Sequence, residues 1–160
     1  MGMQIGPLAV RRCGLVAATP ADLWRAFIEP DRFAAWFGHG HRLEDYEPVA
    51  GGRVRLSVEI DGERRYFGGH VLVLDDAREL SFSNNWETDP WPVPTFVTLR
   101  LRALHEGTLV ELFHHGFERL GARAASEHAA YEAGWHSGHI DALRQLADAS
   151  SAARGPEPGR

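Results

Sequence analysis

The chain has 160 residues, the usual size of one compact domain and too few for two. Its 17 basic and 22 acidic residues give a formal net charge of -5, which disfavours a surface for nucleic acid or for an anionic membrane. Hydrophobic residues make up 44% of the chain, too many for disorder, and the longest aliphatic run, Val71 to Leu74, is too short to span a bilayer. We therefore expect one soluble domain with neither a nucleic-acid nor a membrane partner.

Several kinds of chemistry are excluded by residues and motifs that the sequence lacks. Without lysine, the chain can form neither a Schiff base nor a Walker-type phosphate loop. Its single cysteine, Cys13, cannot form an internal disulfide or a cysteine-based metal cluster. The standard hydrolase, dinucleotide-binding and zinc-protease motifs are also missing. We expect no cofactor, and because the first residues carry no export signal we expect a cytoplasmic location.

A strand and two short helices are predicted at the beginning of the chain. Residues 10–18 read as the strand, and Thr19 then serves as N-cap with Pro20 at the first helical position. Pro30 ends that helix and begins a second one, which Gly38 terminates. Aromatic residues recur at helical spacing on both helices, so both should bury one face.

From His41 the hydrophobic period changes to two. Val54, Leu56, Val58 and Ile60 alternate with polar residues, as in a strand with one buried face, and the Asp61-Gly62 pair that follows predicts a hairpin turn. Similar alternation predicts further strands at 66–74, 79–85, 97–102 and 108–117. The whole segment from His41 onward is expected to form an antiparallel meander of six strands, of which these five have definite ranges.

One long amphipathic helix is predicted over 119–149. Its apolar face is made by residues at three- and four-residue steps, namely Tyr131, Trp135, Gly138, Ala142 and Leu146. Residues 150–160 are small, polar and rich in proline and glycine, so a disordered tail is expected there. The sequence therefore predicts one domain at 1–149.

Motifs spread over residues 8–147 resemble the START-like SRPBCC superfamily, in the branch named for the activator of the heat-shock-protein-90 ATPase. The matching segments are Ala18 to Phe27, Pro30 to Gly38, Gly51-Gly52-Arg53, Gly69 to Leu80 and Gly134-Trp135. The resemblance implies an α+β helix-grip (START/Bet v-like) fold, in which a curved antiparallel sheet of about seven strands holds a long C-terminal helix. It does not fix the function, because the superfamily includes co-chaperone modules, polyketide cyclases, lipid carriers and proteins that sequester toxic natural products.

Within that fold, His114 is the candidate catalytic residue. It shares a strand face with Val110 and Leu112 and should therefore face the groove under the last helix, with His115 on the other side. A buried imidazole must find a partner. It acts either as a ligand hydrogen-bonder or general base, or as a structural histidine bonded to a neighbouring side chain.

The last helix also carries polar residues on neighbouring turns, His128, Glu132, His136 and His139. Imidazole and carboxylate groups at this spacing can bind zinc. Helical geometry spreads the four side chains too widely around the axis, however, and turns His136 toward solvent. No metal site is therefore expected.

The expected ligand site lies in the cavity between sheet and helix. The residues assigned to it are Trp36, Phe37, Phe82, Asn84, Trp86, Phe96, His114, Tyr131, Trp135 and His139. The segment 84–94 holds two tryptophans and three prolines, which suggests either the mouth or lid of a site or a stiff loop covering a core edge. At this position many relatives carry a tryptophan at the end of the preceding strand, whereas this chain has Asn84-Asn85 and then Trp86.

Three functions are compatible with this sequence. The favoured one is the binding, without turnover, of a hydrophobic or aromatic small molecule such as a polyketide-like or lipid-like metabolite. Such binding would serve to sequester a natural product or to give resistance to it. The second is a cofactor-independent cyclase or hydrolase that uses His114 with Tyr131 or His139. The third is a co-chaperone-like module that contacts a heat-shock-protein ATPase, and a homodimer is a further possible partner.

Overall fold

The computed structural model describes residues 7–38 and 40–153. Seven strands and five helical segments follow one another along the chain. Their order is β1 (Ala9–Val16), α1 (Pro20–Ile28), α2 (Pro30–Phe37), β2 (Arg42–Tyr46), β3 (Arg53–Ile60), β4 (Glu63–Asp75), β5 (Glu79–Trp86), β6 (Thr95–Leu104), β7 (Gly107–His115), η1 (Phe117–Arg123), α3 (Ala124–Gly134) and α4 (Gly138–Ala153). The α+β helix-grip fold and the six strands predicted after the helix pair are confirmed.

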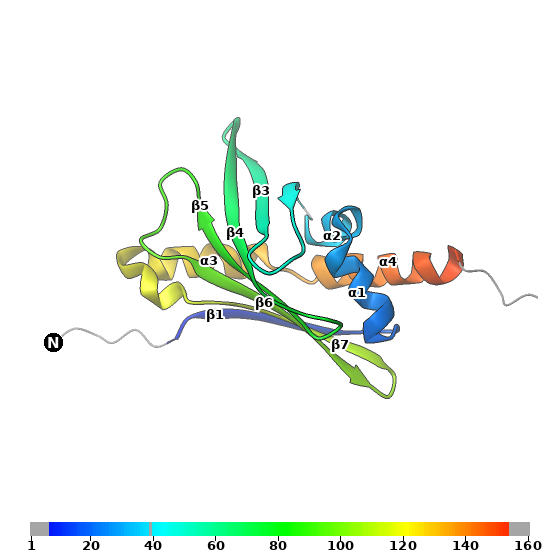
Figure 1. The fold of residues 1–160 in the computed structure, drawn as a ribbon. Helices are drawn as coiled ribbons and strands as arrows, with labels where there is room; N and C mark the ends of the chain where they lie inside the picture. Colours follow the sequence, from blue (N-terminus) through cyan, green and yellow to red (C-terminus); the bar gives the residue numbers. More distant parts are fainter. Residues whose placement is uncertain (1–6, 39, 154–160) are drawn as a thin grey trace, which may run out of the picture.

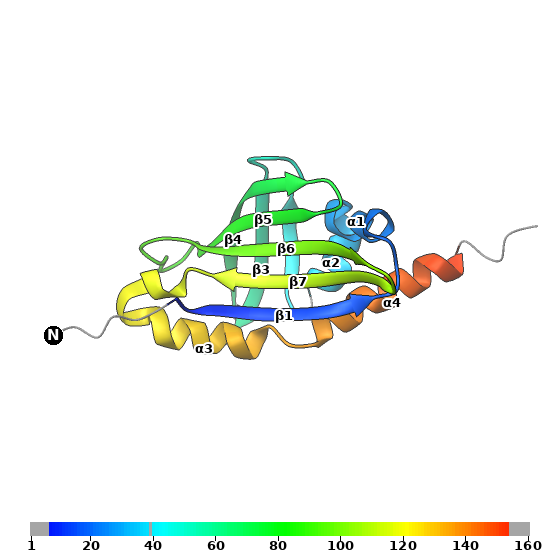
Figure 2. The same cartoon turned by 90° about the horizontal axis from the view of Figure 1, so that it is seen from below.

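The strands form one antiparallel sheet in the order β1-β7-β6-β5-β4-β3-β2. The first strand therefore pairs with the last, Val10 opposite His114, while the intervening strands follow one another as hairpins. The sheet is curved, and α3 and α4 run along one of its faces (Figures 1 and 2). This places the C-terminal helices opposite the side chains on the inner face of the strands.

Local signals in the sequence set the start of α1 and the turn between β3 and β4 as predicted. The hydroxyl of Thr19 accepts a hydrogen bond from the backbone N–H of Asp22, and Pro20 begins α1. Asp61 and Gly62 both have positive φ, 51° and 80°, which is the backbone of a two-residue turn that matches the twist of a β-hairpin. The β3–β4 hairpin is therefore set by its own turn residues.

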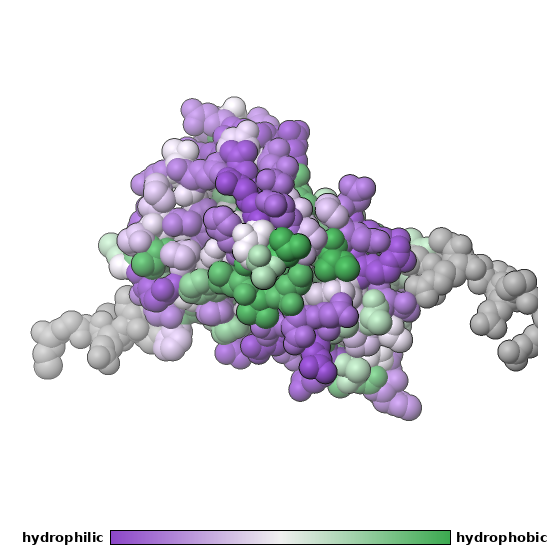
Figure 3. Space-filling model, in the orientation of Figure 1, coloured by the Kyte–Doolittle hydropathy of each residue, from purple (hydrophilic) through white to green (hydrophobic). Residues whose placement is uncertain are grey.

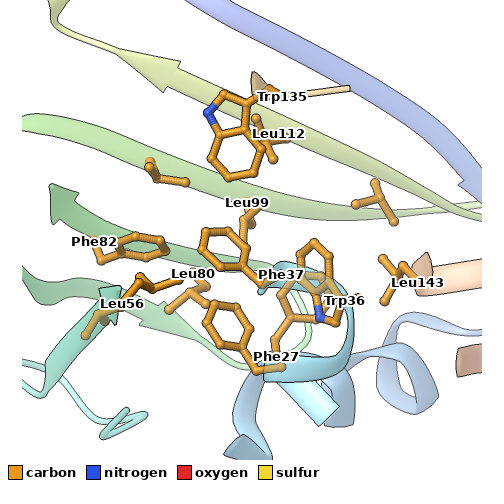
Figure 4. Close-up of a cluster of buried hydrophobic side chains, with 14 of the residues drawn as sticks. Phe27, Trp36, Phe37, Leu56, Leu80, Phe82, Leu99, Leu112, Trp135 and Leu143 are labelled. Atoms are coloured by element: carbon orange, nitrogen blue, oxygen red, sulfur yellow. The ribbon is translucent and has the colours of Figure 1, made fainter. Parts of the chain in front are cut away.

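Aromatic side chains of α1 and α2 fill one end of the core. Figure 4 shows Phe27 and Trp36 together there, and Phe37 facing Phe82 and Trp135. The Trp36 indole donates a 2.8 Å hydrogen bond to the carbonyl of Ala26, which satisfies its polar atom inside the core. The two short helices thus close this end of the space between the sheet and the C-terminal helices.

The C-terminal helical region is not the single helix predicted over 119–149. It begins as the 3-10 segment η1, continues as α3 and breaks after Gly134, where Trp135 has extended backbone (φ -83°, ψ 96°), before α4 begins at Gly138. Arg12 on β1 holds the break: its Nε donates to the carbonyl of Trp135 (2.7 Å) and its Nη2 to that of Glu132 (2.8 Å). Helix carbonyls that lose their N–H partners at the break are satisfied by a guanidinium from another element.

Two further features concern the ends and the surface. Helix α4 extends past the predicted boundary at residue 149 as far as Ala153, and the rest of the expected tail, 154–160, lies outside the described residues. An apolar patch lies on the face seen in Figure 3. None of the helices formed by residues 7–38 and 40–153 is both long and apolar enough to cross a membrane.

Candidate functional site

A cavity of about 240 Å³ lies between the inner face of the sheet and the helices α2 and α3. Its apolar walls come from consecutive strands and consist of Leu56, Val58, Phe67, Phe82 and Val97. Its edge is made by four lining residues that are also exposed, His41, Ile60, Ala130 and Gly134. The cavity therefore opens between the end of β3 and α3.

Most of the residues predicted to bind a ligand lie at this cavity. Eight of the ten line it: Phe37, Phe82, Asn84, Trp86, His114, Tyr131, Trp135 and His139. Two do not. Trp36 is fully buried among the helices α1 and α2, and Phe96 lies on the opposite face of the sheet.

The position of Phe96 follows from strand alternation. Its neighbour Val97 pairs with His114 and lines the cavity, so Phe96 pairs with His115 and faces away. On that outer face the Arg119 guanidinium lies 5.0 Å from the Phe96 ring centroid. The prediction that Phe96 binds the ligand is therefore wrong, because Val97, Leu99 and Leu101 alternate onto the inner face and Phe96 falls on the other one.

Several residues that were not predicted to bind a ligand also line the cavity. Leu56 and Val58 were recognised as the buried face of a strand, and only the structure shows that part of that face borders a cavity. Glu127, Ala130 and Gly134 line the cavity from α3, although they are small or polar and carry no signal of an apolar face.

His114 is held on both sides by other side chains. Its Nδ1 accepts a 2.9 Å hydrogen bond from the Trp135 indole N–H, and its Nε2 lies 2.7 Å from the hydroxyl oxygen of Thr95. Because an indole can only donate, Nδ1 is unprotonated and Nε2 carries the proton. Burial, with a smaller contribution from His115, lowers the pKa of His114 to about 3. The imidazole is therefore neutral near pH 7, with both nitrogens occupied.

A second group of polar side chains meets at the cavity where β5 faces α3. Asn84 on β5 donates from Nδ2 to the phenolic oxygen of Tyr131 on α3, 3.2 Å away. Burial raises the pKa of the Tyr131 phenol, while the hydrogen bond from the Asn84 side chain opposes that rise. Tyr131 is therefore an uncharged phenol at physiological pH, and it lines the cavity.

The two tryptophans of segment 84–94 occupy different places. Trp86 lines the cavity and packs on Phe67, with ring centroids 4.8 Å apart. Trp91 is buried beside the aromatic rings of Phe117 and Tyr131, and its backbone N–H donates to the Asn85 side chain. One indole therefore faces the cavity, and the other covers an edge of the core.

The polar residues of the C-terminal helices do not converge. His128 bonds through Nε2 to the carbonyl of Ala9 (2.8 Å), and Glu132 forms an ion pair with Arg12. His139 lies at the cavity, with its ring 4.8 Å from that of Trp135. Within the part of the chain that the structure describes, no three His, Cys, Asp or Glu residues are grouped so as to hold a metal ion.

A curved antiparallel sheet that encloses an apolar cavity against C-terminal helices defines a helix-grip protein. The model of one family, described as activator of Hsp90 ATPase homolog 1-like protein, matches residues 17–148. The match covers most of the chain, which therefore belongs to this family. A search of curated proteins finds no match.

Solved structures share the fold over nearly the whole chain. Protein MLL2253 from Mesorhizobium loti is 23% identical with a TM-score of 0.67, and the alignment covers 89% of this chain and 98% of that one. A protein from Rhodobacter sphaeroides is 25% identical with a TM-score of 0.66, covering 94% and 97%. DynU16, described as a putative protein in the dynemicin biosynthetic locus, is 23% identical with a TM-score of 0.65, covering 89% of this chain and 48% of its own.

Proposed function

We propose that this protein binds a small, neutral aromatic molecule in the cavity between the sheet and α3. The observation that carries the proposal is the cavity itself, about 240 Å³ with predominantly apolar walls. An apolar protein cavity of about 150 Å³ stays dry and binds benzene. By that comparison, the cavity accommodates a molecule of about two fused rings. A larger polyketide-like or lipid-like metabolite would extend past Ala130 and Gly134 at the edge.

The lining favours an uncharged ligand. Among the described residues that line the cavity, Glu127 is the one carboxylate and none is an arginine. A ligand carboxylate or phosphate would therefore lose its hydration in the cavity and find no arginine there to pair with, which is costly in an apolar site. Neutral aromatic molecules lose no such hydration and pack against Phe37, Phe82 and Trp135.

The state of His114 favours binding over catalysis. A general base needs a free nitrogen within reach of the substrate and a pKa near the working pH. Both nitrogens of His114 have protein partners, and burial lowers its pKa to about 3. Tyr131, the proposed acid, has its pKa raised away from neutrality. These properties support a binding protein rather than a cyclase or hydrolase that depends on His114.

Two variants on the exposed side of α3 test the proposal. Ala130 lines the edge of the cavity, whereas its neighbour Ala129 is exposed and does not line it. We expect naphthalene to bind the wild-type protein with saturable heat and a negative heat-capacity change, as apolar burial requires. Ala130→Trp should weaken this binding at least tenfold by obstructing the cavity, while Ala129→Trp should leave it unchanged, in isothermal titrations.

The same variants separate binding from the co-chaperone alternative. A chaperone contact would use the exterior and would not require the cavity. If naphthalene fails to bind the wild-type protein, or if it binds Ala130→Trp and Ala129→Trp equally well, the cavity is not the functional site and the interaction module becomes the better account.

A further inference from the structure

The hydrogen bonds around the cavity form a chain with one donor direction. It starts at the Trp135 indole, which only donates and therefore fixes His114 as an acceptor at Nδ1 and a donor at Nε2. His114 then donates to the Thr95 hydroxyl (2.7 Å), which in turn donates to the backbone carbonyl of Asn84 (3.4 Å). The indole N–H of Trp135, at the break after α3, in this way sets the donor and acceptor roles of groups on β7, β6 and β5.

The next hydrogen bond leads to Tyr131. The side-chain amide of Asn84 donates to the Tyr131 oxygen at 3.2 Å. The phenolic oxygen is therefore the acceptor in its contact with Asn84.

The hydroxyl proton of Tyr131 comes next in this chain of hydrogen bonds. A hydroxyl has one proton to donate, and among the described residues no acceptor for the Tyr131 proton is found. Tyr131 also lines the cavity. A buried donor without an acceptor costs free energy, and an acceptor on a molecule in the cavity removes that cost.

We propose that the cavity selects neutral aromatic molecules that carry a hydrogen-bond-accepting oxygen, above all an aryl ketone or aldehyde, through donation from the Tyr131 hydroxyl. This inference rests on the proposed function and adds its specificity. Tyr131 has the role of a ligand-binding donor, while Asn84 is a positioning residue that donates a hydrogen bond to its oxygen. Glu127, at the same cavity, disfavours a carboxylate as the acceptor.

The discriminating probes are 2-acetylnaphthalene and 2-ethylnaphthalene, which differ mainly in a carbonyl against a methylene group. Their dissociation constants are measured by titration calorimetry on the wild-type protein, on Tyr131→Phe and on Tyr66→Phe. Tyr66 is the matched control, because it lies outside the cavity lining and packs under the Arg55 guanidinium.

We expect Tyr131→Phe to weaken binding of 2-acetylnaphthalene, relative to that of 2-ethylnaphthalene, by about 2- to 10-fold compared with the wild-type protein. This is the effect of losing one neutral hydrogen bond. Tyr66→Phe should keep the wild-type ratio. An unchanged ratio in Tyr131→Phe, with both probes still bound, overturns this inference and leaves the proposed function intact. If neither probe binds the wild-type protein, the proposed function itself is wrong.

An infrared measurement shows the hydrogen bond directly. The carbonyl stretch of bound 2-acetylnaphthalene should lie below its value in cyclohexane in the wild-type protein and in Tyr66→Phe, and should return to that value in Tyr131→Phe. A stretch that stays lowered in Tyr131→Phe assigns the donor to Asn84 or Trp86 and overturns the role of Tyr131. If Tyr131→Phe does not fold, the wild-type spectrum decides, because an unshifted stretch excludes a donor at the ligand oxygen.

Discussion

The buried imidazole of His114 should make the protein unstable in acid. Its pKa is about 3 in the folded protein, against 6.5 for an unperturbed histidine. The unfolded chain therefore takes up a proton below pH 6.5 that the folded protein resists, and the free energy of unfolding falls as the pH falls from 6.5 toward 3. Above pH 6.5 the full contribution of this group is present.

The magnitude follows from the two pKa values. Relative to pH 8, the loss from His114 alone is about 2 kcal/mol at pH 5 and about 3 kcal/mol at pH 4. Small domains have total stabilities of about 5–15 kcal/mol, so this is a substantial part of the whole. The physical cause is that a charged imidazole at this buried position would lose its hydration by water. Its protonated Nδ1 would also be a donor that faces another donor, the indole N–H of Trp135.

The assay is urea unfolding at constant ionic strength at pH 8, 6, 5 and 4, on the wild-type protein and on His114→Asn. The asparagine places an amide oxygen near the position of Nδ1 and has no proton to take up. We expect the pH-dependent loss in His114→Asn to be smaller than in wild type by about 2 kcal/mol at pH 5. His105→Asn, at an exposed position in the turn between β6 and β7, is the control. Parallel pH profiles for wild type and His114→Asn would refute the reasoning.

Three substitutions test the packing and the backbone. Trp135→Ala removes a buried aromatic side chain and should lower the free energy of unfolding by about 3–5 kcal/mol, and a loss below 1 kcal/mol in urea would mean that the indole does not pack in the core. Gly68 has φ +137°, and an added Cβ would lie 2.0 Å from the carbonyl oxygen of Val54, so Gly68→Ala should lower the melting temperature more than Gly62→Ala, whose Cβ would meet nothing within 4 Å. Equal melting temperatures for these two variants would contradict the close strand contact. Thr19→Ala should cost about 1 kcal/mol through loss of its N-cap hydrogen bond, measured by chemical unfolding, and no loss would exclude that cap as a source of stability.

The parts of the fold that depend on local chemistry could be predicted from the sequence. Thr19 and Pro20 determine the start of α1, Asp61-Gly62 determines a hairpin, and period-two alternation places Val97 and His114 on the inner face. Each of these signals lies within a few residues of the feature it determines. The family motifs then supplied the arrangement of the elements around a central space.

The break after α3 could not be predicted from local signals in the sequence. Tyr131 and Trp135 are four residues apart, which is helical spacing, so the pattern predicts a continuous helix. The carbonyl of Trp135 at the break is instead bound by Arg12, which is 123 residues away in the chain. The partners of His114 are equally distant in sequence, so its structural role became visible only with the fold.

The most direct test of the proposed ligand site uses the indole N–H signals of the tryptophans in a two-dimensional ¹H–¹⁵N NMR spectrum. Trp86 and Trp135 line the cavity, whereas Trp24 and Trp36 are buried in the core and do not line it. Titration with 2-acetylnaphthalene should shift the indole signals of Trp86 and Trp135 progressively and leave those of Trp24 and Trp36 in place. Saturable binding that leaves Trp86 and Trp135 unshifted would show that the ligand site is elsewhere and would contradict the proposed function.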